Sequence, residues 1–439
     1  MGILLLCFCF FAQATELNQW IIAEYKIALG KMSQNISPVG TAAGIVIASP
    51  SRQEPDYYFH WVRDSALVVN ALLGQSPGQP LTPEQLKTVD DFISLSRQIQ
   101  LTPSLTGLGE PRFNVDGLAY FGAWARPQND GPALRALTLL HILDLGVVES
   151  RRKKISQILE ADLDFIRTHF AETSFDIWEE IRADHFYTSL VQMAALKKAE
   201  AHFDPNWNFS IFDCEAARAE IEMRLHRHWS ADKKYLSISL NRQEGGDNKK
   251  TDLDSAVILG VLHSGLDQAD FFSVRDARVL STAWHLENIF QQIYAINQTD
   301  LAPAIGRYED DVYFGGNPWY LTTLAFAELH YRLAISLRER PQFQITELNI
   351  AFFKKAMGSE GNALRVGFDL ADDPVMAKKI GRLLIDRGDQ FVARVRTHAP
   401  ADGALSEQFN RVNGFALSAR DLTWSYASFL TAIQFRNAF

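Results

Sequence analysis

Two short stretches far apart in the chain hold carboxylates that are suited to acid–base chemistry. One is DIWEE, which begins at Asp176 and ends with Glu179 and Glu180, and the other is LSEQF, which contains Glu407. Hydrolysis of a glycosidic bond needs a protonated carboxyl group that donates to the leaving oxygen. It also needs an ionised one that activates water or attacks carbon. The two stretches therefore favour glycoside hydrolysis, whereas the alternative for DIWEE is the acidic start of a helix.

Aromatic residues and an Arg–Asp pair accompany these carboxylates. Five of the nine tryptophans lie in or beside polar loops: Trp61, Trp124, Trp178, Trp319 and Trp424. Aromatic rings can stack on sugar rings, although any single tryptophan is as easily explained by packing. In WVRDS, Arg63 can donate in a fork and Asp64 can accept from adjacent hydroxyls, unless the pair only begins a helix. Taken together, these residues indicate a carbohydrate site.

Charge and missing motifs argue against several other functions. The chain of 439 residues has a net charge of −9, whereas a nucleic-acid footprint needs a basic stripe. We therefore expect no nucleic-acid partner and a neutral substrate. The sequence has no glycine-rich phosphate loop, no HExxH pair and no GxSxG elbow. We accordingly expect neither a metal nor a cofactor.

Helical periodicity dominates the elements that must position these residues. Apolar stripes at helical spacing run through 16–31, 61–74, 83–100, 132–147, 155–170, 186–202, 211–229, 252–264, 274–297, 318–339, 374–398 and 421–437. Alternation typical of strands is scarce, and it predicts at most a short hairpin near 231–243. No low-complexity linker interrupts the pattern. The sequence predicts an all-α protein with one domain over residues 15–439.

The unusual residues lie in alternate loops between these helices. In an up-and-down helical array, alternate loops emerge at the same end, so the polar and aromatic loops would meet at one mouth. The last such loop, around LSEQF, falls at the same end only if the stretch 349–357, whose helical pattern is weak, is an inserted helix. Twelve helices in alternating inner and outer positions form an α/α toroid. We therefore predict a toroid with the site at one end.

The N-terminus resembles a secretion signal. An apolar run from Ile3 to Phe11 ends in Ala12-Gln13-Ala14, an A-x-A cleavage pattern. The run is too short to span a bilayer, and its alternative is a buried N-terminal strand. We expect a signal peptide over residues 1–14. The mature protein would then be secreted or periplasmic and would have no membrane contact.

Long motifs in the chain resemble the fungal-type glucoamylases of glycoside hydrolase family fifteen. The most specific are WVRDSALV, PRFNVDG, ARPQNDGPALRA, FDIWEE, GRYEDD…GGNPWYL and LSEQFNRVNGFALSARDLTWSYA, and the resemblance runs roughly from Gly40 to Ala432. It implies an (α/α)6 toroid, the six-hairpin glycosidase fold. It also implies an exo-acting enzyme that releases glucose from the non-reducing ends of α-1,4-glucans or maltooligosaccharides. Inversion at the anomeric carbon would yield β-glucose.

The resemblance also implies roles for individual residues. The first Glu of WEE, Glu179, corresponds to the general acid, and Glu407 corresponds to the general base. The second Glu, Glu180, matches a ligand of the sugar beyond the scissile bond. The remaining implied substrate contacts are Arg63 and Asp64 on the terminal glucose, Arg307, the acidic neighbour Asp176, and the aromatic residues Tyr57, Trp61, Trp124, Trp178, Tyr313 and Trp319.

Departures from the family pattern keep some alternatives open. RADH follows the WEE motif where small residues are usual, so Arg182 and His185 could narrow or charge the outer subsites. His60 stands where Thr is usual. The sequence has no linker or starch-binding module after the last helix, so we expect soluble substrates to suit it better than raw granules. We also expect a monomer. The alternatives are an α-glucoside hydrolase that prefers α-1,6 links or trehalose, or a non-catalytic carbohydrate-binding relative.

Overall fold

The computed structural model describes residues 2–75, 78–146 and 148–439, and the side chains from Thr15 onward within these ranges. Thirteen α-helices lie in the described ranges. They are α1 (Gly2–Gln34), α2 (Val62–Leu73), α3 (Pro83–Leu101), α4 (Gly131–Asp144), α5 (Glu149–His169), α6 (Phe186–Ala199), α7 (Ile211–His226), α8 (Ala256–Ser264), α9 (Ala277–Ile293), α10 (Tyr320–Glu339), α11 (Ile350–Met357), α12 (Pro374–His398) and α13 (Thr423–Ala438). Each of the twelve predicted helices is present. The predicted end of the fourth helix at 147 lies outside the described residues.

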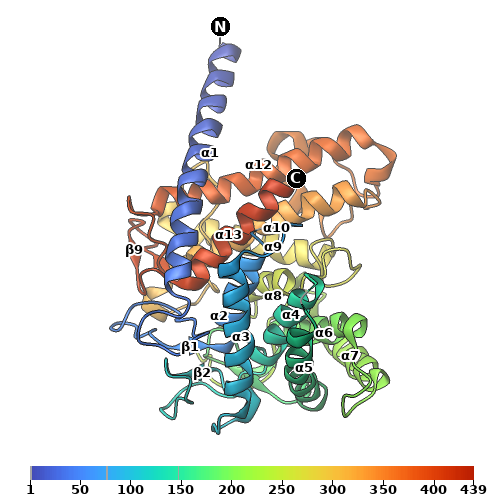
Figure 1. Ribbon diagram of the computed structural model, residues 1–439. Coiled ribbons are helices and arrows are strands. Elements are labelled where there is room, and N and C mark those ends of the chain that lie inside the picture. Colours follow the sequence, from blue (N-terminus) through green and yellow to red (C-terminus); the bar gives the residue numbers. More distant parts are fainter. Residues whose placement is uncertain (1, 76–77, 147) are drawn as a thin grey trace.

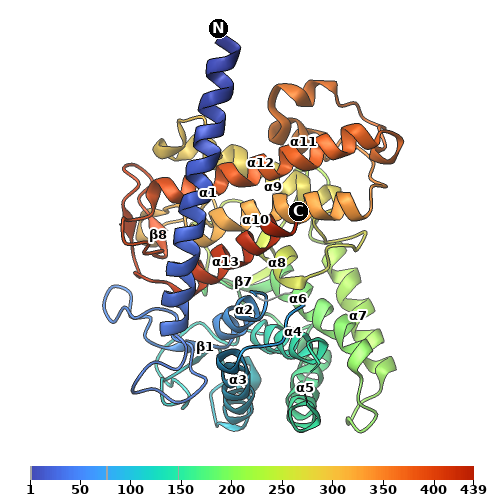
Figure 2. The ribbon, with the colours of Figure 1, turned by 45° about the horizontal axis from the view of Figure 1, so that its top comes forward.

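Six of these helices form a closed inner ring. In ring order they are α2, α4, α6, α8, α10 and α13, and α13 contacts α2 to close the circle. Helices α1, α3, α5, α7, α9 and α12 lie outside them, and α11 packs on α9 and α12 (Figures 1 and 2). The (α/α)6 toroid is confirmed. The stretch 349–357 is the inserted helix that the alternation of loops required.

Burial distinguishes inner from outer helices. Nearly every residue of α10 is buried, as expected for a helix that packs on all sides. Helix α5 is amphipathic instead, and it buries the predicted stripe of Ile155, Ile158, Leu159, Leu163 and Ile166. Outer α12 packs closely on α10 at Gly388, where a Cβ atom would lie 2.3 Å from the Tyr331 ring. The inner helices therefore form the core, and the outer ones cover it.

Short strands tie the mouth loops to one another. β1 (His60–Trp61) pairs with β2 (Arg112–Phe113), and β8 (Gln408–Phe409) with β9 (Ala416–Leu417). A three-stranded sheet joins β3 (Ser174–Phe175), β4 (Arg182–His185) and β7 (Ser239–Glu244). β5 (Trp229–Ser230) and β6 (Tyr235–Leu236) form a hairpin. All nine strands of the described chain lie in the loops that precede the inner helices.

The predicted hairpin near 231–243 is only partly correct. A hairpin does form, but it spans 229–236, and β7 turns away to pair with β4 from a different loop. Local alternation identifies an extended segment without identifying its partner. The pairing of β7 with β4 connects the DIWEE loop to the loop before α8.

The N-terminal residues belong to helix α1, so the alternative of a buried N-terminal strand is wrong. The first part of α1 extends away from the toroid (Figures 1 and 2). Further along, Leu17, Ile21, Ala28 and Met32 are buried on the side that packs against α13. In the described part of the chain, no helix has the length and apolar character needed to cross a membrane. The signal peptide over 1–14 remains a prediction.

Candidate active site

A cavity of about 650 Å³ lies where the mouth loops meet the first turns of the inner helices. Twelve of the thirteen predicted site residues line this front cavity: Tyr57, Trp61, Arg63, Asp64, Trp124, Trp178, Glu179, Glu180, Arg307, Tyr313, Trp319 and Glu407. They come from five different loops and from helix α2. The cavity has the size and mixed lining of a small-molecule site.

Three N–H donors converge on one oxygen of Glu179. Its Oε1 accepts from Trp61 Nε1 at 2.8 Å, Trp124 Nε1 at 2.9 Å and Gln128 Nε2 at 2.8 Å. Its Oε2 has no hydrogen-bond partner among the described residues. Arg63 Nη2 lies 3.8 Å from Oε1. The carboxyl group is therefore fixed by one oxygen, and the other remains available.

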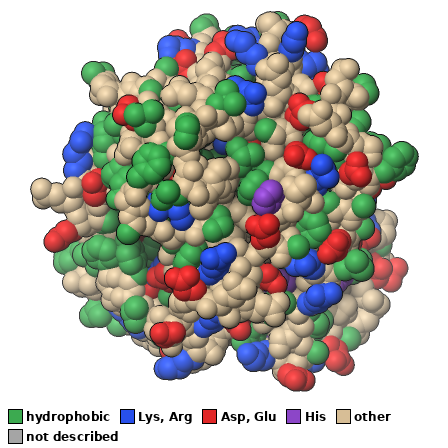
Figure 3. All heavy atoms as spheres, turned by 90° about the horizontal axis from the view of Figure 1, so that it is seen from below, with side chains coloured by type: hydrophobic (Ala, Val, Ile, Leu, Met, Phe, Trp, Pro, Cys, Tyr) green, Lys and Arg blue, Asp and Glu red, His purple; other side chains and the backbone are tan. Residues whose placement is uncertain are grey.

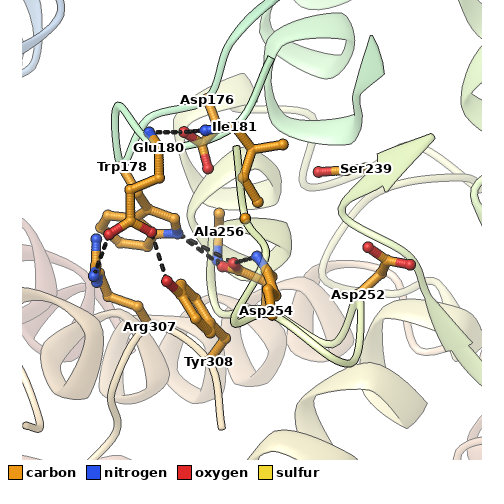
Figure 4. Close-up of polar contacts among 12 residues, drawn as sticks. Asp176, Trp178, Glu180, Ile181, Ser239, Asp252, Asp254, Ala256, Arg307 and Tyr308 are labelled. Atoms are coloured by element: carbon orange, nitrogen blue, oxygen red, sulfur yellow. Dashed lines mark hydrogen bonds and ion pairs between the residues drawn. The ribbon is translucent and has the colours of Figure 1, made fainter. Parts of the chain in front are cut away.

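Asp176 lies behind the loop rather than in the wall of the front cavity. Its Oδ1 accepts from the backbone N–H of Glu180 at 2.8 Å and of Ile181 at 3.1 Å (Figure 4). Glu179 adopts a φ of 64° within this turn, a conformation that non-glycine residues rarely adopt. Asp176 therefore holds the backbone turn that presents Glu179 and Glu180.

Glu180 binds a buried arginine. Its Oε1 accepts from Arg307 Nη2 at 2.7 Å, and its Oε2 accepts from the Tyr308 hydroxyl at 2.6 Å (Figure 4). Arg307 also donates to Asp311, from Nε at 2.8 Å. Burial raises the pKa of the Glu180 carboxyl group above its ordinary value, although the charge of Arg307 opposes this effect. Glu180 and Arg307 thus present a paired charge to the cavity.

The Trp178 indole forms part of the wall beside Arg307. Its Nε1 donates to Asp254 at 3.0 Å (Figure 4), and Asp254 forms a buried ion pair with Lys249. The Trp178 ring lies 5.5 Å from the Trp319 ring and 5.5 Å from the Arg307 guanidinium carbon. Asp254 and Lys249 come from the loop before α8, so this support could not be predicted from the DIWEE motif.

Glu407 immediately precedes β8 and is 1% exposed. Its Oε2 accepts from Gln408 Nε2 at 3.0 Å and from the Ser418 hydroxyl. Burial raises the pKa of Glu407 to about 7, whereas the hydroxyls of Ser418 and Tyr57 and the charge of Arg307 act to lower it. The surroundings make this carboxylate a stronger proton acceptor than an exposed one.

The interpretation of the Arg63–Asp64 pair as a helix start is confirmed, and the interpretation as a sugar clamp stays a prediction. Asp64 is in the first turn of α2, and both residues line the front cavity. Arg63 Nη1 donates to Gln128 Oε1 at 2.9 Å and to Asp130 Oδ2 at 2.8 Å. Burial raises the pKa of Asp64 to about 7 despite the positive charge of Arg63. Gln128 thus connects Arg63 to the Glu179 carboxyl group.

An arginine that the sequence did not single out supports the aromatic wall. The guanidinium carbon of Arg112 lies 4.9 Å from the Trp61 ring and 4.0 Å from the Trp124 ring. Phe59 and Tyr120 also flank it, at 3.6 and 4.4 Å. A cation between aromatic faces holds them in place. Its position in the motif PRFNVDG was the only signal in the sequence, because two of the four rings come from a different loop, the one before α2.

The residues that depart from the family pattern do not line the front cavity. His185 is buried; its Nε2 donates to the carbonyls of Ser174 and Ile181, and its Nδ1 lies 3.0 Å from the Ser239 hydroxyl. Burial lowers the pKa of His185 to about 4. The expectation that His185 shapes an outer subsite is wrong, because it packs beneath the loop.

His60 and Arg182 also have structural partners. His60 Nδ1 accepts from the Val46 N–H at 3.1 Å, and burial lowers the pKa of His60 to about 3. Arg182 Nε donates to the Thr173 hydroxyl at 3.3 Å. All three departures therefore contact neighbouring loop residues and lie outside the lining of the front cavity.

Comparison with known proteins agrees with this geometry. The family described as "Glycosyl hydrolases family 15" matches residues 26–434. Glucoamylase-1 of Schizophyllum commune is 33% identical over 99% of this chain and 77% of its own length. The intracellular sporulation-specific glucoamylase of Saccharomyces cerevisiae is 31% identical over 96% of this chain and 85% of its own.

Two solved structures share the whole architecture. The glucoamylase of Saccharomycopsis fibuligera has a TM-score of 0.87 and 31% identity, covering 96% of both chains. The family 15 glucoamylase of Hypocrea jecorina has a TM-score of 0.87 and 30% identity, covering 96% of this chain and 72% of that one. The chain belongs to glycosyl hydrolase family 15.

Proposed function

We propose that this protein is an exo-acting glucoamylase that inverts the anomeric centre and releases β-D-glucose from the non-reducing ends of α-1,4-glucans. Glu179 is the general acid in this proposal, and Glu407 is the general base. The observation that carries it is the presence of both carboxylates in one cavity, in different surroundings. The glucoamylases of similar sequence, at 31–33% identity over nearly the whole chain, support the substrate class.

The hydrogen bonds of Glu179 determine which oxygen carries the proton. Three N–H groups donate to Oε1 and occupy its lone pairs. The proton of the neutral carboxyl group is therefore on Oε2, to which no described residue forms a hydrogen bond. A glycosidic oxygen placed beside Oε2 receives this proton as the bond breaks.

Glu407 activates the water that completes the reaction. Because it is buried, its carboxylate is poorly solvated and gains from taking a proton. Inversion requires the water to lie between the base and the sugar and to attack the anomeric carbon from the face opposite the leaving oxygen. Ser418 and Gln408 both bind Oε2 of Glu407 and so orient the carboxylate. After the reaction, water exchange returns the proton to Glu179.

Charged pairs around the cavity recognise the sugar hydroxyls. Arg63 and Asp64 are buried in the first turn of α2, and Arg307 and Glu180 lie beside the Trp178 indole. Carboxylates accept from hydroxyls and guanidinium groups donate to them, so each pair can engage a neutral sugar without a counterion. We assign Asp176 a positioning role, because it contacts the backbone of the loop.

The shape of the site supports an exo-acting mode. Asp64 and Trp424, in the first turns of the inner helices α2 and α13, line the front cavity. Lining from inside the ring supports a cavity that a glucan enters with a chain end. We also propose that the protein is a monomer with a single catalytic domain over 15–439.

The cellular location and other partners remain part of the proposal. The A-x-A pattern after the apolar N-terminal run supports export, although the yeast relative is named as intracellular. On the face shown in Figure 3, basic and acidic side chains are interspersed. Together with the net charge of −9, this distribution supports the absence of a nucleic-acid partner.

A substrate panel tests the proposal. Glucose release from maltose, isomaltose, trehalose and soluble starch is measured at equal concentrations of non-reducing ends. The proposal expects fastest release from maltose and starch, and glucose as the first product from starch. Preference for isomaltose or trehalose would support the alternative α-glucosidases, and a ladder of oligosaccharides from starch would contradict exo action.

A further inference from the structure

A second cavity, of about 700 Å³, lies at the other end of the inner ring. The front cavity is lined by mouth loops and the first turns of inner helices. This rear cavity is lined mainly by the later turns of all six inner helices, for example Asn70 on α2, His141 on α4, Lys197 on α6 and Arg332 on α10. It is comparable in volume to the front cavity, and the proposed reaction does not use it.

The rear cavity contains buried polar groups with unused hydrogen-bonding capacity. Arg332 is 4% exposed and donates to Asp267, from Nε at 2.9 Å, and to Glu328 Oε1, from Nη1 at 2.9 Å. The second oxygen of Glu328 has no hydrogen-bond partner among the described residues. An acceptor is thus available inside the cavity.

The ionisable side chains of the rear cavity are nearly balanced in charge, and burial raises the pKa of one of them, Glu328, to about 7. Histidines apart, its cations are Lys197, Lys198 and Arg332, and its carboxylates are Asp144, Asp267 and Glu328. Lys198 lies 3.1 Å from Asp144, so most of these charges are already paired. A charged ligand would disturb this balance, whereas a neutral ligand with many hydroxyls would not.

Apolar side chains complete the lining. Leu67, Leu137, Leu262, Phe435 and one side of Trp424 lie among the polar groups. The front cavity has the same combination of aromatic faces, carboxylates and arginine. Pyranose sugars have apolar faces and a hydroxyl edge, and both kinds of lining match them.

Trp424 separates the two cavities, because it lines both. Beside it, the His263 ring lies 5.8 Å away, and His263 Nδ1 lies 2.8 Å from the Tyr187 hydroxyl. On the front side, the Arg63 guanidinium carbon is 6.0 Å from the Trp424 ring. The two cavities thus lie back to back along the axis of the ring.

We propose that the rear cavity is a second carbohydrate site, which binds a neutral mono- or disaccharide such as maltose independently of catalysis. Methyl NMR of the full chain carrying Glu179→Gln, which prevents consumption of maltose, can observe both cavities at once. Ile177 lines only the front cavity, whereas Leu67, Leu137 and Leu262 line only the rear one. Maltose is expected to shift both sets of signals, each with its own dissociation constant.

Two matched substitutions separate specific binding from general effects. Thr431 on α13 and Thr397 on α12 both donate to the carbonyl four residues earlier, at 2.9 Å, but only Thr431 lines the rear cavity. Thr431→Phe should raise the dissociation constant for maltose measured at the rear methyls at least tenfold. The dissociation constant measured at Ile177 should not change. Thr397→Phe should preserve both responses. If Thr431→Phe does not fold, Ser428→Phe fills the same cavity.

The outcomes distinguish this inference from the proposed catalytic function. The second site would be overturned if the rear methyls did not respond to maltose, or if they responded equally in the Thr431→Phe protein. In either case Ile177 would still report binding in the front cavity. Inorganic phosphate is expected to leave the rear methyls unchanged. If phosphate shifts them and maltose does not, the cavity binds anions and the inference is wrong.

Discussion

The two proposed catalytic carboxylates occupy contrasting regions of the front cavity. Glu179 lies at the tip of a loop held by Asp176, its side chain is 19% exposed, and three N–H groups bind one of its oxygens. Glu407 is 1% exposed directly before β8, and hydroxyl and amide groups bind it. One carboxyl group is fixed with a free oxygen, and the other is buried with a pKa near 7.

This contrast shows how one site can divide acid and base roles between identical side chains. The acid needs an oxygen that is free to carry a proton toward the substrate. The base needs weak solvation, so that proton uptake is favourable. Substitutions at each position should therefore have different consequences.

The largest effect is expected from removing the proton of the acid. Glu179→Gln keeps an oxygen that can accept from Trp61, Trp124 and Gln128, but it cannot donate a proton from Oε2. We expect kcat on maltotriose to fall by about 10³-fold or more, within the range of general acid catalysis. Steady-state rates measure this. Glu172→Gln, an exposed residue of the same loop, is the control and should keep full activity. A kcat near that of the unmodified protein would exclude Glu179 as the acid.

Substitution of the base should change stability as well as activity. Because the pKa of Glu407 is about 7 in the folded chain and its ordinary value is 4.5, the folded chain holds this proton more tightly than the unfolded one. Ionisation of Glu407 therefore lowers the free energy of unfolding. This loss is absent below pH 4.5 and complete above pH 7. Glu407→Gln removes up to about 3 kcal/mol of this loss.

Urea unfolding at pH 8 and pH 4 measures the difference. The free energy of unfolding of the Glu407→Gln protein should exceed that of the unmodified protein at pH 8 and be similar to it at pH 4. Its activity should be lost at both. Equal changes in stability at the two pH values would show that the carboxylate is not destabilised by burial.

A smaller effect is expected from the hydroxyl that supports the base. Ser418 acts to lower the pKa of Glu407, so Ser418→Ala should raise it. The acidic limb of the kcat/KM profile, which reports ionisation of the base, should move to higher pH by about half to one unit. Ser94→Ala on outer helix α3 is the control. Movement to lower pH, or none, would contradict the role of Ser418.

The helical scaffold could be predicted from the sequence because each helix has its own apolar stripe. The polar loops alternate along the chain, which indicated the end of the toroid at which they meet. The helix within 349–357 preserves this alternation up to the last polar loop. Pairing between loops could not be predicted. β7 pairs with β4 rather than locally, because its partner is selected by three-dimensional proximity.

The catalytic pair could be identified from short motifs, but its supporting contacts could not. Gln128 and Arg112 lie within motifs that the sequence made conspicuous, yet only the fold brings Gln128 to Glu179 and aromatic rings around Arg112. His185 shows the converse. A polar residue next to the site was expected to face substrate, but it is buried with partners of its own.

The division of roles between Glu179 and Glu407 is tested most directly by the anomer of the first product. Proton NMR during the first minutes of maltotriose hydrolysis observes the anomeric signals before mutarotation mixes them. A water activated by Glu407, opposite the proton donor Glu179, must yield β-glucose. Initial accumulation of β-glucose is the predicted result. Initial accumulation of α-glucose would show retention and contradict the assignment of Glu407 as a general base.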